Sequence, residues 1–422
     1  MQRPNAAQKT HKTAPGGIPV DWEAINLGDY IKEISLRNFP INSDLPVLSV
    51  TNSQGFVNSE SYFDRKVYSK DLSNYKIIHK EQFAYNPSRI NVGSIAQLKS
   101  FDGGLLSPMY VVFEAQKGLH ADYLAYWIQS RRFKNLINAN TQGTVRDSVN
   151  FSALAVFPFA RPPVYEQKKI TAILACIDGL IDKTKSVIDQ TQRLKKALMQ
   201  ELFTRGVPGR HRNFKKTKIG DIPEEWEVRR LNDLCLKITD GEHLTPKFCG
   251  SGQVLLSAKD VRENDVSFHD SKFISTEDFN KFRLRCDPKS GDVLVVSRGA
   301  TIGRICFLNT NKIFSLMGSV IQIRTDEKKL SGIYLSKFLK TDYAQTELIR
   351  TSGSSAQQAI YLVHLKNFRI AVPSIHEQRL ITKNLESMDS GIEANGFLVN
   401  QLQLLKSALM QVLLTGEVRI KI

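Results

Sequence analysis

The chain has 422 residues, more than one hydrophobic core usually organises, so its length predicts two to four domains. No run of eighteen apolar residues occurs and no apolar segment follows Met1, so we expect neither a membrane span nor a secretory signal, and we expect a soluble cytoplasmic protein. The 58 Lys and Arg residues outnumber the 42 Asp and Glu residues, and the formal net charge of +16 is typical of proteins that bind nucleic acid.

The first half of the chain predicts a short tail followed by a domain. Residues 1–17 are polar and are predicted to be a flexible N-terminal segment, and residues 18–160 are predicted to form the first globular domain. Short β-type runs such as Val47–Val50 alternate with turn residues, and one helical stretch lies around Ala121–Asn138. This mixture predicts an α+β domain.

Residues 161–205 are predicted to form a long helix. Between positions 166 and 203 there is no Pro and one Gly, and apolar residues recur with a seven-residue period. At about 1.5 Å per residue such a helix is on the order of 55 Å long, which favours a spacer that pairs with another helix. Packing into an ordinary core is the alternative. The residues predicted to form the pairing seam are Ile170, Ile177, Leu180, Val187, Leu194 and Leu198.

A basic connector, residues 206–218, follows the long helix. Gly206, Pro208 and Gly209 are predicted to end the helix. The basic excess of the chain is concentrated here and in the helix before it, because residues 156–220 hold 14 Lys and Arg but five Asp and Glu.

The second half repeats this plan. Residues 219–371 predict a second α+β domain, with β-type runs such as Asp292–Val296 and a helical stretch around Ile333–Ile349. Residues 372–416 predict a second long helix, and residues 417–422 a C-terminal tail. The residues predicted to form its pairing seam are Ile381, Met388, Asn395, Leu398, Leu402, Leu405 and Leu409. A polar residue in the seam, such as Asn395, can fix the register of a coiled coil.

The two halves are copies of one unit. Identical residues between Glu166 and Gln200 recur between Glu377 and Gln411 at a constant offset of 211 residues, and Ile18-Pro-Val-Asp-Trp-Glu23 recurs as Ile222-Pro-Glu-Glu-Trp-Glu227 at an offset of 204. The sequence therefore predicts an internal duplication in which each domain is followed by a long helix.

No complete catalytic or metal-binding constellation occurs in the sequence. There is no phosphate-binding G-x-x-x-x-G-K-[ST] loop, and Tyr85-Asn-Pro-Ser88 lacks the second proline and the aromatic residue of an amino-methyltransferase motif. His376-Glu377 lacks the second His of a zinc-binding H-E-x-x-H, so capping or packing is predicted for Glu377. The five cysteines are widely spaced and form no C-x-x-C pair, so we expect reduced thiols and no metal site.

Several segments resemble, in order along the chain, the conserved regions of type I restriction-modification specificity subunits. They are Glu166–Arg210, Ile219–Val228, Asp240–Lys247 and Gly291–Arg304. Together with the duplication, the resemblance covers essentially the whole chain.

The resemblance implies two target-recognition domains held apart by two helices that pair as an antiparallel coiled coil about a pseudo-twofold axis. Each domain would read one half of a split site in double-stranded DNA, about one helical turn apart. The subunit would bind two modification (methyltransferase) subunits and, where the system has them, two restriction (motor-nuclease) subunits. The chain itself would be non-catalytic and bind no cofactor, while S-adenosylmethionine, ATP and Mg²⁺ would be used by those partners.

The candidate DNA contacts lie in loops that differ between the two domains. In the alignment of the two halves, Ser297–Gly303 corresponds to Ser88–Ser94, and Gly353–Ala359 corresponds to Gln142–Asp147. Arg can bond guanine bidentately, and Gln or Asn can bond adenine. The candidates are Asn52, Arg89, Gln142, Thr144, Arg146, His243, Lys247, Lys259, Arg298, Thr301, Arg304, Ser355, Gln357 and Gln358. For each of them a phosphate contact or a solvated surface position is the alternative, and for His243 a hydrogen bond that orders its own loop.

Two other functions compete with this hypothesis. One is a stand-alone DNA-modifying or DNA-cleaving enzyme, which turnover by the purified chain would reveal. The other is an interaction scaffold without sequence readout, which weak, sequence-independent DNA binding would indicate.

Overall fold

The computed structural model describes residues 10–13, 16–40, 43–63, 68–141, 148–350 and 358–420. The chain divides into two compact units. The first unit is Met1–Lys185 together with Phe397–Ile422, and the second unit is Ser186–Gly396. Two long helices, α5 (Val164–Thr204) and α10 (Ile375–Leu413), each supply one part to either unit.

The first unit is built around a four-stranded antiparallel sheet in the order β4-β11-β8-β9. Its strands are β4 (Ile31–Ile34), β11 (Val111–Ala115), β8 (Phe83–Tyr85) and β9 (Ile95–Gln97). The other strands pair in twos: β1 (Thr10–Thr13) with β2 (Gly16–Pro19), β3 (Glu23–Asn26) with β12 (Pro158–Arg161), β5 (Leu48–Thr51) with β6 (Gly55–Asn58), and β7 (Lys76–His79) with β10 (Gly103–Leu106).

Aromatic residues fill the core between this sheet and the helices of the first unit. Phe83 stacks on Phe113 with ring centroids 5.1 Å apart, and Trp127 meets Phe159 edge-on at 4.8 Å. Ile170 and Leu174 of α5 are buried in the same core. The helical elements are η1 (Leu27–Asp29), α1 (Ser59–Phe63), η2 (Ile90–Val92), α2 (Ala121–Trp127), α3 (Arg131–Thr141) and α4 (Phe151–Ala155).

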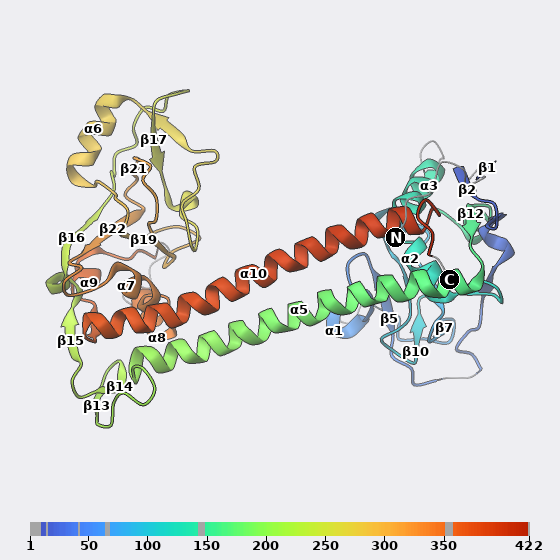
Figure 1. The fold of residues 1–422 in the computed structure, drawn as a ribbon, viewed down its shortest axis with the longest axis horizontal. Coiled ribbons are helices and arrows are strands. Elements are labelled where there is room, and N and C mark those ends of the chain that lie inside the picture. The colour runs from blue at the N-terminus through green and yellow to red at the C-terminus, as the bar shows by residue number, and fades with distance from the viewer. Residues whose placement is uncertain are drawn as a thin grey trace. The chain divides into compact units, whose positions relative to one another are not determined.

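The second unit has a matching sheet in the order β16-β22-β19-β20 (Figure 1). All four residues of β19 are buried because both faces of the strand are covered: Val293 and Val295 face one core cluster, and Leu294 and Val296 face another. The β-branched and aliphatic sequence of the strand suits this position. The strands are β16 (Cys235–Asp240), β22 (Val320–Thr325), β19 (Val293–Val296) and β20 (Ile305–Phe307).

A smaller layer of the second unit contains a three-stranded sheet and a helix. It consists of β18 (Lys272–Ile274), β17 (Gln253–Leu256), β21 (Ser315–Leu316) and α6 (Thr276–Arg285). The remaining elements are the pairs β13 (Phe214–Thr217) with β14 (Gly220–Pro223) and β15 (Glu227–Arg230) with β23 (Arg369–Val372), and the helices η3 (Leu231–Leu234), η4 (Ala258–Asp260), α7 (Gly332–Phe338), α8 (Asp342–Arg350) and α9 (Leu362–Lys366).

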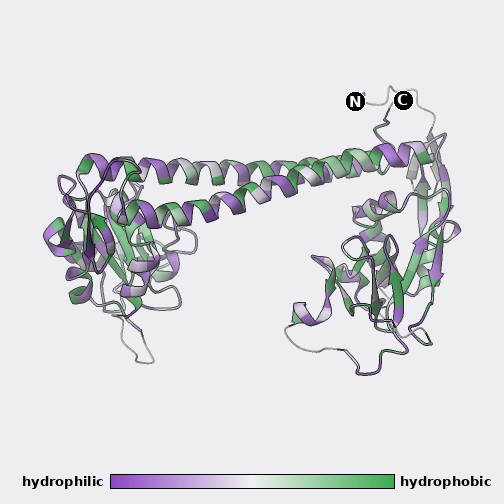
Figure 2. Ribbon diagram, turned by 90° about the horizontal axis from the view of Figure 1, so that it is seen from below, coloured by the Kyte–Doolittle hydropathy of each residue, from purple (hydrophilic) through white to green (hydrophobic). Residues whose placement is uncertain are grey.

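The two units repeat one topology, which confirms the predicted α+β fold and its duplication. Helices α2, α3 and α4 correspond to α7, α8 and α9 at the offset of 211 residues, and the pair β3–β12 corresponds to β15–β23. In both units the strands are largely hydrophobic and the loops largely polar, as Figure 2 shows.

In each unit one part of α5 lies against one part of α10. In the first unit Asp178 of α5 pairs with Lys406 of α10 at 2.7 Å, and in the second unit Lys195 of α5 pairs with Asp389 of α10. Residues near the start of one helix therefore meet residues near the end of the other, so the helices run antiparallel. The two ion pairs are equivalent, because 178 and 389, and 195 and 406, differ by the same 211 residues.

Part of the predicted seam is wrong by one residue. Ile170, Ile177 and Ile381 are buried, and Leu198, Met388, Asn395, Leu402 and Leu409 are half-buried. The other five residues remain 45–62% exposed: Leu180, Val187, Leu194, Leu398 and Leu405. After Leu180 and Leu398 the following residue, Ile181 or Val399, is buried instead. After Leu194 and Leu405 the following residue is a half-buried lysine that pairs with the other long helix.

The physical reason is that apolar residues stand side by side at several of these positions, for example at Leu180-Ile181 and at Leu398-Val399. Adjacent residues of a helix point about 100° apart, so only one of each pair can face the partner. The seven-residue period fits either choice, and packing decides between them.

Each long helix begins with a buried carboxylate that ties the helix to the start of its unit. In the first unit Glu166 accepts the indole N–H of Trp22 at 2.9 Å and the guanidinium of Arg419 at 2.8 Å. In the second unit Glu377 accepts the indole N–H of Trp226 at 3.1 Å and is bonded to His211 Nε2 at 2.7 Å. Glu377 therefore has the packing role expected from the sequence.

Two segments that the sequence describes as flexible or as a plain connector contain paired strands. The strand pair β1–β2 begins at Thr10, inside the predicted flexible segment 1–17, and β13 lies inside the predicted connector 206–218. The connector is also held by His211, which bonds Glu377, 166 residues away, and by Lys215 Nζ, which donates to the carbonyl of Glu224. The first contact joins residues far apart in sequence, so local composition does not reveal it. Among the described residues, no helix is long and apolar enough to cross a membrane.

Candidate nucleic-acid interface

The turn between β21 and β22, Met317–Ser319, brings several loops of the second unit together. Gly318 donates its N–H to the carbonyl of Glu242 at 2.7 Å, Ser297 donates its N–H to the carbonyl of Ser319 at 2.9 Å, and Ala258 donates its N–H to Ser319 Oγ at 3.2 Å. The ends of β16, β17 and β19 therefore meet the start of β22 at one edge of the unit.

His243 lies on the loop that follows β16 at this edge. Its Nε2 is 2.8 Å from Oδ2 of Asp240, and its ring packs so closely on Gly318 that a Cβ there would lie 2.6 Å from Nδ1. Gly241 is equally confined, because a Cβ would lie 2.1 Å from the carbonyl oxygen of Leu316. The loop is thus rigid, and the side chain of His243 is 40% exposed in a fixed orientation.

Arg298 and Gln358 are brought together although they lie 60 residues apart. Arg298 forms an isolated antiparallel bridge with Ala359, and Ile360 donates its N–H to the carbonyl of Ser297 at 2.9 Å. Both Arg298 and Gln358 are exposed. The backbone at Ala359 thus brings the two exposed residues onto neighbouring chain segments, and a guanidinium and an amide have the donor and acceptor groups needed to read base edges.

The other candidates of the second unit have mixed environments. Lys259 is exposed beside Ala258, and its ammonium donates to the carbonyl of Asp270 at 3.3 Å, while Lys247 is exposed on the loop after β16. Thr301 is half-buried in the turn after Arg298. Arg304 points inward and donates to the carbonyl of Val261 at 3.0 Å, so its guanidinium is engaged within the domain.

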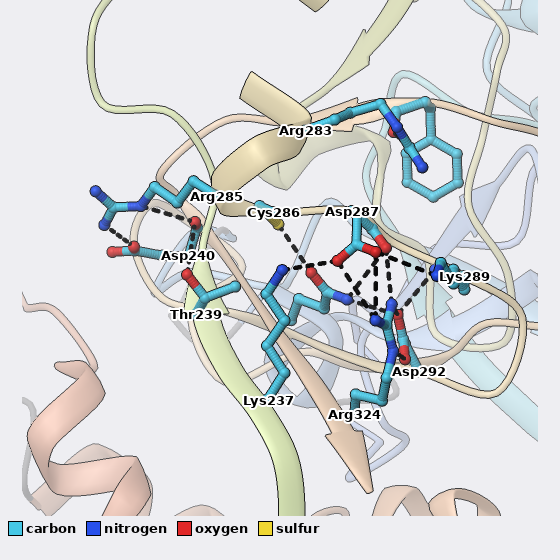
Figure 3. A network of polar contacts seen from close by, with 12 residues as sticks. Lys237, Thr239, Asp240, Arg283, Arg285, Cys286, Asp287, Lys289, Asp292 and Arg324 are labelled. Carbon is cyan, nitrogen blue, oxygen red and sulfur yellow. Dashed lines mark hydrogen bonds and ion pairs between the residues drawn. The ribbon is translucent and has the colours of Figure 1, made fainter. Parts of the chain in front are cut away.

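Asp240, the partner of His243, belongs to a network of polar contacts that Figure 3 shows. Asp240 pairs with Arg285, which ends α6, as well as with His243. Nearby, Arg324 of β22 donates to Asp292 at 2.9 Å and pairs with Asp287 at 3.3 Å. Strands β16 and β22 are thereby locked to the end of α6.

Lys237 completes this network by donating to Asp287 at 2.7 Å. Burial opposes ionisation of Asp287, but the hydrogen bonds and positive charges of Lys237 and Arg324 outweigh it, so the pKa of Asp287 lies well below its ordinary value. The hydrogen bond to Asp292 correspondingly raises the pKa of Arg324. Asp287 and Arg324 therefore both carry their charges near neutral pH.

The first unit places Asn52 and Arg89 at one loop cluster. Asn52 is exposed in the turn between β5 and β6. It lies next to Gly93, because a Cβ added to Gly93 would be 3.6 Å from the Cβ of Asn52. Arg89 is exposed at the start of the tight turn that ends at Gly93, and the N–H of Ser94 closes this turn on the carbonyl of Arg89 at 3.1 Å. Gly93 has a φ of +96°, a conformation that favours glycine.

The remaining candidates, Gln142, Thr144, Arg146, Ser355 and Gln357, lie outside the described residues. Asp240, Gly318 and Ser319 are not among the predicted DNA contacts, and they hold these loops together without presenting base-reading groups. The adjacent Asp240-Gly-Glu-His243 string was the available signal, because a carboxylate three residues before a histidine can orient it. Among the described residues, no group of three or more His, Cys, Asp or Glu is placed to hold a metal ion.

Comparison with known proteins shows two matches to one family model within the chain. The model described as type I restriction modification DNA specificity domain matches residues 19–192 and again residues 223–404. The chain is 27% identical over 419 residues to the type I restriction enzyme MjaVIII specificity subunit of Methanocaldococcus jannaschii, covering 96% of this chain and 94% of that protein. It is 26% identical over 274 residues to the EcoBI specificity subunit of Escherichia coli, covering 61% and 56%.

Solved structures share the fold. One of them comes from a study of complex assembly and conformational transition in a type I R-M system. It superposes with a TM-score of 0.62 at 18% identity, covering 95% of this chain and 99% of the other. The HsdS subunit from Thermoanaerobacter tengcongensis superposes with a TM-score of 0.52 at 19% identity, covering 97% and 100%.

Proposed function

Because the chain belongs to the family of type I restriction modification DNA specificity domains, we propose that it is the DNA-recognising subunit of a type I restriction-modification complex. Each target-recognition domain reads one half of a split site in double-stranded DNA. The observation that carries the proposal is that His243, Arg298 and Gln358 lie on loops joined by hydrogen bonds at the ends of strands β16, β19 and β22. A second copy of the same topology supplies the reader of the other half-site.

The chain recognises DNA, and its partners carry out the chemistry. We propose two modification subunits and, where the system has them, two restriction subunits as partners. The leucines and valine left exposed on the long helices, Leu180, Val187, Leu194, Leu398 and Leu405, support docking of the modification subunits on these faces. S-adenosylmethionine, ATP and Mg²⁺ are then used by the partners and not by this chain.

Genome-wide methylation mapping tests this proposal. Cells that carry this gene with its modification subunit should show adenine methylation at one split site, and cells that lack the gene should not. Purified chain incubated with DNA, S-adenosylmethionine, ATP and Mg²⁺ should show no turnover. Methylation or cleavage by the monodisperse chain alone would contradict the proposal.

Single substitutions should change one half-site only. Arg298→Ala and Gln358→Ala should each relax the recognised base at one position, at a cost of about 1–3 kcal/mol in discrimination, because a bidentate contact is lost. Lys328→Ala, which removes an exposed cation of the same unit away from this edge, is the control. If the substitutions instead weaken binding to all DNA equally, these residues contact phosphates.

A further inference from the structure

The first unit contains a pocket of about 490 Å³ between α3 and the last turns of α10. Trp127, Met410 and Leu414 form apolar parts of its wall. Basic residues from the start of α3 line it as well: Arg131, Arg132 and Lys134. Among the lining residues, all of which the structure describes, none is Asp or Glu. The pocket therefore has a positive charge that its own walls leave uncompensated.

The fold does not explain these three cations. Among the described residues, none of them has an acidic ion-pair partner, and the side chain that acts electrostatically on Arg132 there is the Tyr123 phenol. Positive side chains in the first turn of a helix are also disfavoured by the helix dipole. Three neighbouring cations without an acidic partner repel one another, so a binding role accounts for their presence better than stability does.

The second unit has different residues at the positions of these three cations. At the offset of 211 residues, Arg131, Arg132 and Lys134 correspond to Asp342, Tyr343 and Gln345. A pocket of about 590 Å³ lies there, with Phe338 at the position of Trp127 and Met199 at the position of Met410.

The charges of the second pocket are compensated internally. Asp342 pairs with Lys196 at 3.1 Å, and Lys196 corresponds to the neutral Ser407 of the first unit. The second unit thus forms the same helix arrangement with an acidic residue, Asp342, at the position of Arg131. The cations of the first pocket are therefore not needed to build this arrangement.

The first pocket adjoins the proposed DNA-contacting loops. A neighbouring pocket of about 610 Å³ shares Lys134 and Met410 with it and extends to Asn52 and to the turn 90–93 beside Arg89. Helix α3 itself leads directly into the segment 142–147, which carries three of the predicted base contacts.

We propose that the pocket between α3 and α10 in the first unit binds a phosphate group, with Arg132 as its principal donor. A guanidinium can bond phosphate oxygens through its Nη–H groups, and Arg132 lines the pocket. Arg131 and Lys134 add charge at the same place. The phosphate comes either from the backbone of DNA bound to the first domain or from a free phosphate-bearing small molecule. The DNA source rests on the proposed function, and the free source does not.

Titration of the full-length chain with inorganic phosphate at constant ionic strength tests the site itself. Calorimetry should show binding that the double variant Arg132→Gln with Lys134→Gln weakens at least about tenfold, the effect of losing charge-assisted hydrogen bonds. The matched control, Lys168→Gln with Lys169→Gln, removes two exposed charges of α5 in the same unit and should stay within about twofold of the original affinity.

A second variant guards against misfolding. Arg131→Asp, Arg132→Tyr and Lys134→Gln together install the residues that the chain already carries in its second unit. This variant should unfold as cooperatively as the original chain and should no longer bind phosphate.

DNA binding at several salt concentrations distinguishes the two sources. The plot of log K against log salt has a negative slope. If the phosphate belongs to DNA, this slope should be shallower by about 0.9 in the double variant, with the recognised sequence unchanged. If phosphate binding is lost while the DNA slope is unchanged, the site takes a free phosphate compound. If neither changes, or if the control variant shows the same losses, the proposal is overturned. Absence of any sequence preference in the original chain would refute the proposed function, while the phosphate titration would still decide this site.

Discussion

The indole N–H of Trp22 donates a 2.9 Å hydrogen bond to the buried carboxylate of Glu166, 144 residues further along the chain. The same bond recurs between Trp226 and Glu377 in the second unit. Each bond joins the first residues of a domain to the first turn of the helix that follows the domain. The start and end of each domain are thereby closed on one another.

Replacing Trp22 should destabilise the first unit. Trp22→Phe leaves the charged, buried Glu166 with one donor fewer, so we expect a loss of about 1–3 kcal/mol in the free energy of unfolding. Denaturant unfolding monitors the change, and Trp226→Phe should have a comparable effect through Glu377. Glu166→Gln with Trp22 intact keeps an acceptor oxygen and serves as the comparison. A loss below about 0.5 kcal/mol for both Trp variants would show that the bond is offset by other interactions.

Acid should weaken the second unit through Asp287. Its folded-state pKa lies below the value of the unfolded chain, so its contribution to stability is complete above about pH 4 and is lost as the pH falls through the folded-state pKa. Asp287→Asn should remove this part of the pH dependence, because the amide does not titrate. Urea unfolding between pH 7 and pH 3 measures the effect. An unchanged acid dependence in Asp287→Asn would assign it to other carboxylates.

The basic connector should contribute sequence-independent affinity for DNA. Arg210, Arg212, Lys216 and Lys218 are exposed, whereas Lys215 donates to the carbonyl of Glu224. Replacing these four residues with Gln should weaken binding to specific and unrelated DNA alike and reduce the magnitude of the salt slope by up to about four. If DNA binding is unchanged and only assembly with the modification subunit fails, the connector is a protein-binding surface.

The long helices should set the gap between the half-sites. Inserting seven residues into each helix keeps the seven-residue seam in register and adds about 10 Å, or about three base pairs at about 3.4 Å. The insertions belong near Lys183–Asp189 and Ala394–Asn400. Methylation mapping should then show unchanged half-sites with a longer gap. Altered bases with an unchanged gap would contradict the spacer role of the helices.

The sequence by itself determined the duplication and the plan of domain, helix, domain and helix. The repeats at offsets of 211 and 204 residues are long enough to establish the copies, and a Pro-free stretch with a seven-residue period establishes the helices. It also located exposed candidates such as Arg89, Arg298 and Gln358, because turn residues and polar chemistry are visible locally.

The tertiary structure decided which of two adjacent apolar residues faces the partner helix, since the period of the sequence allows either Leu180 or Ile181. It also showed that Arg304 bonds inward to Val261 and that Asp240 and Gly318 hold His243 in place. Apart from the contact of Asp240 with His243, these relationships join residues from 43 to 228 positions apart through packing and hydrogen bonds. A local pattern carries no record of such partners, so only the folded chain reveals them.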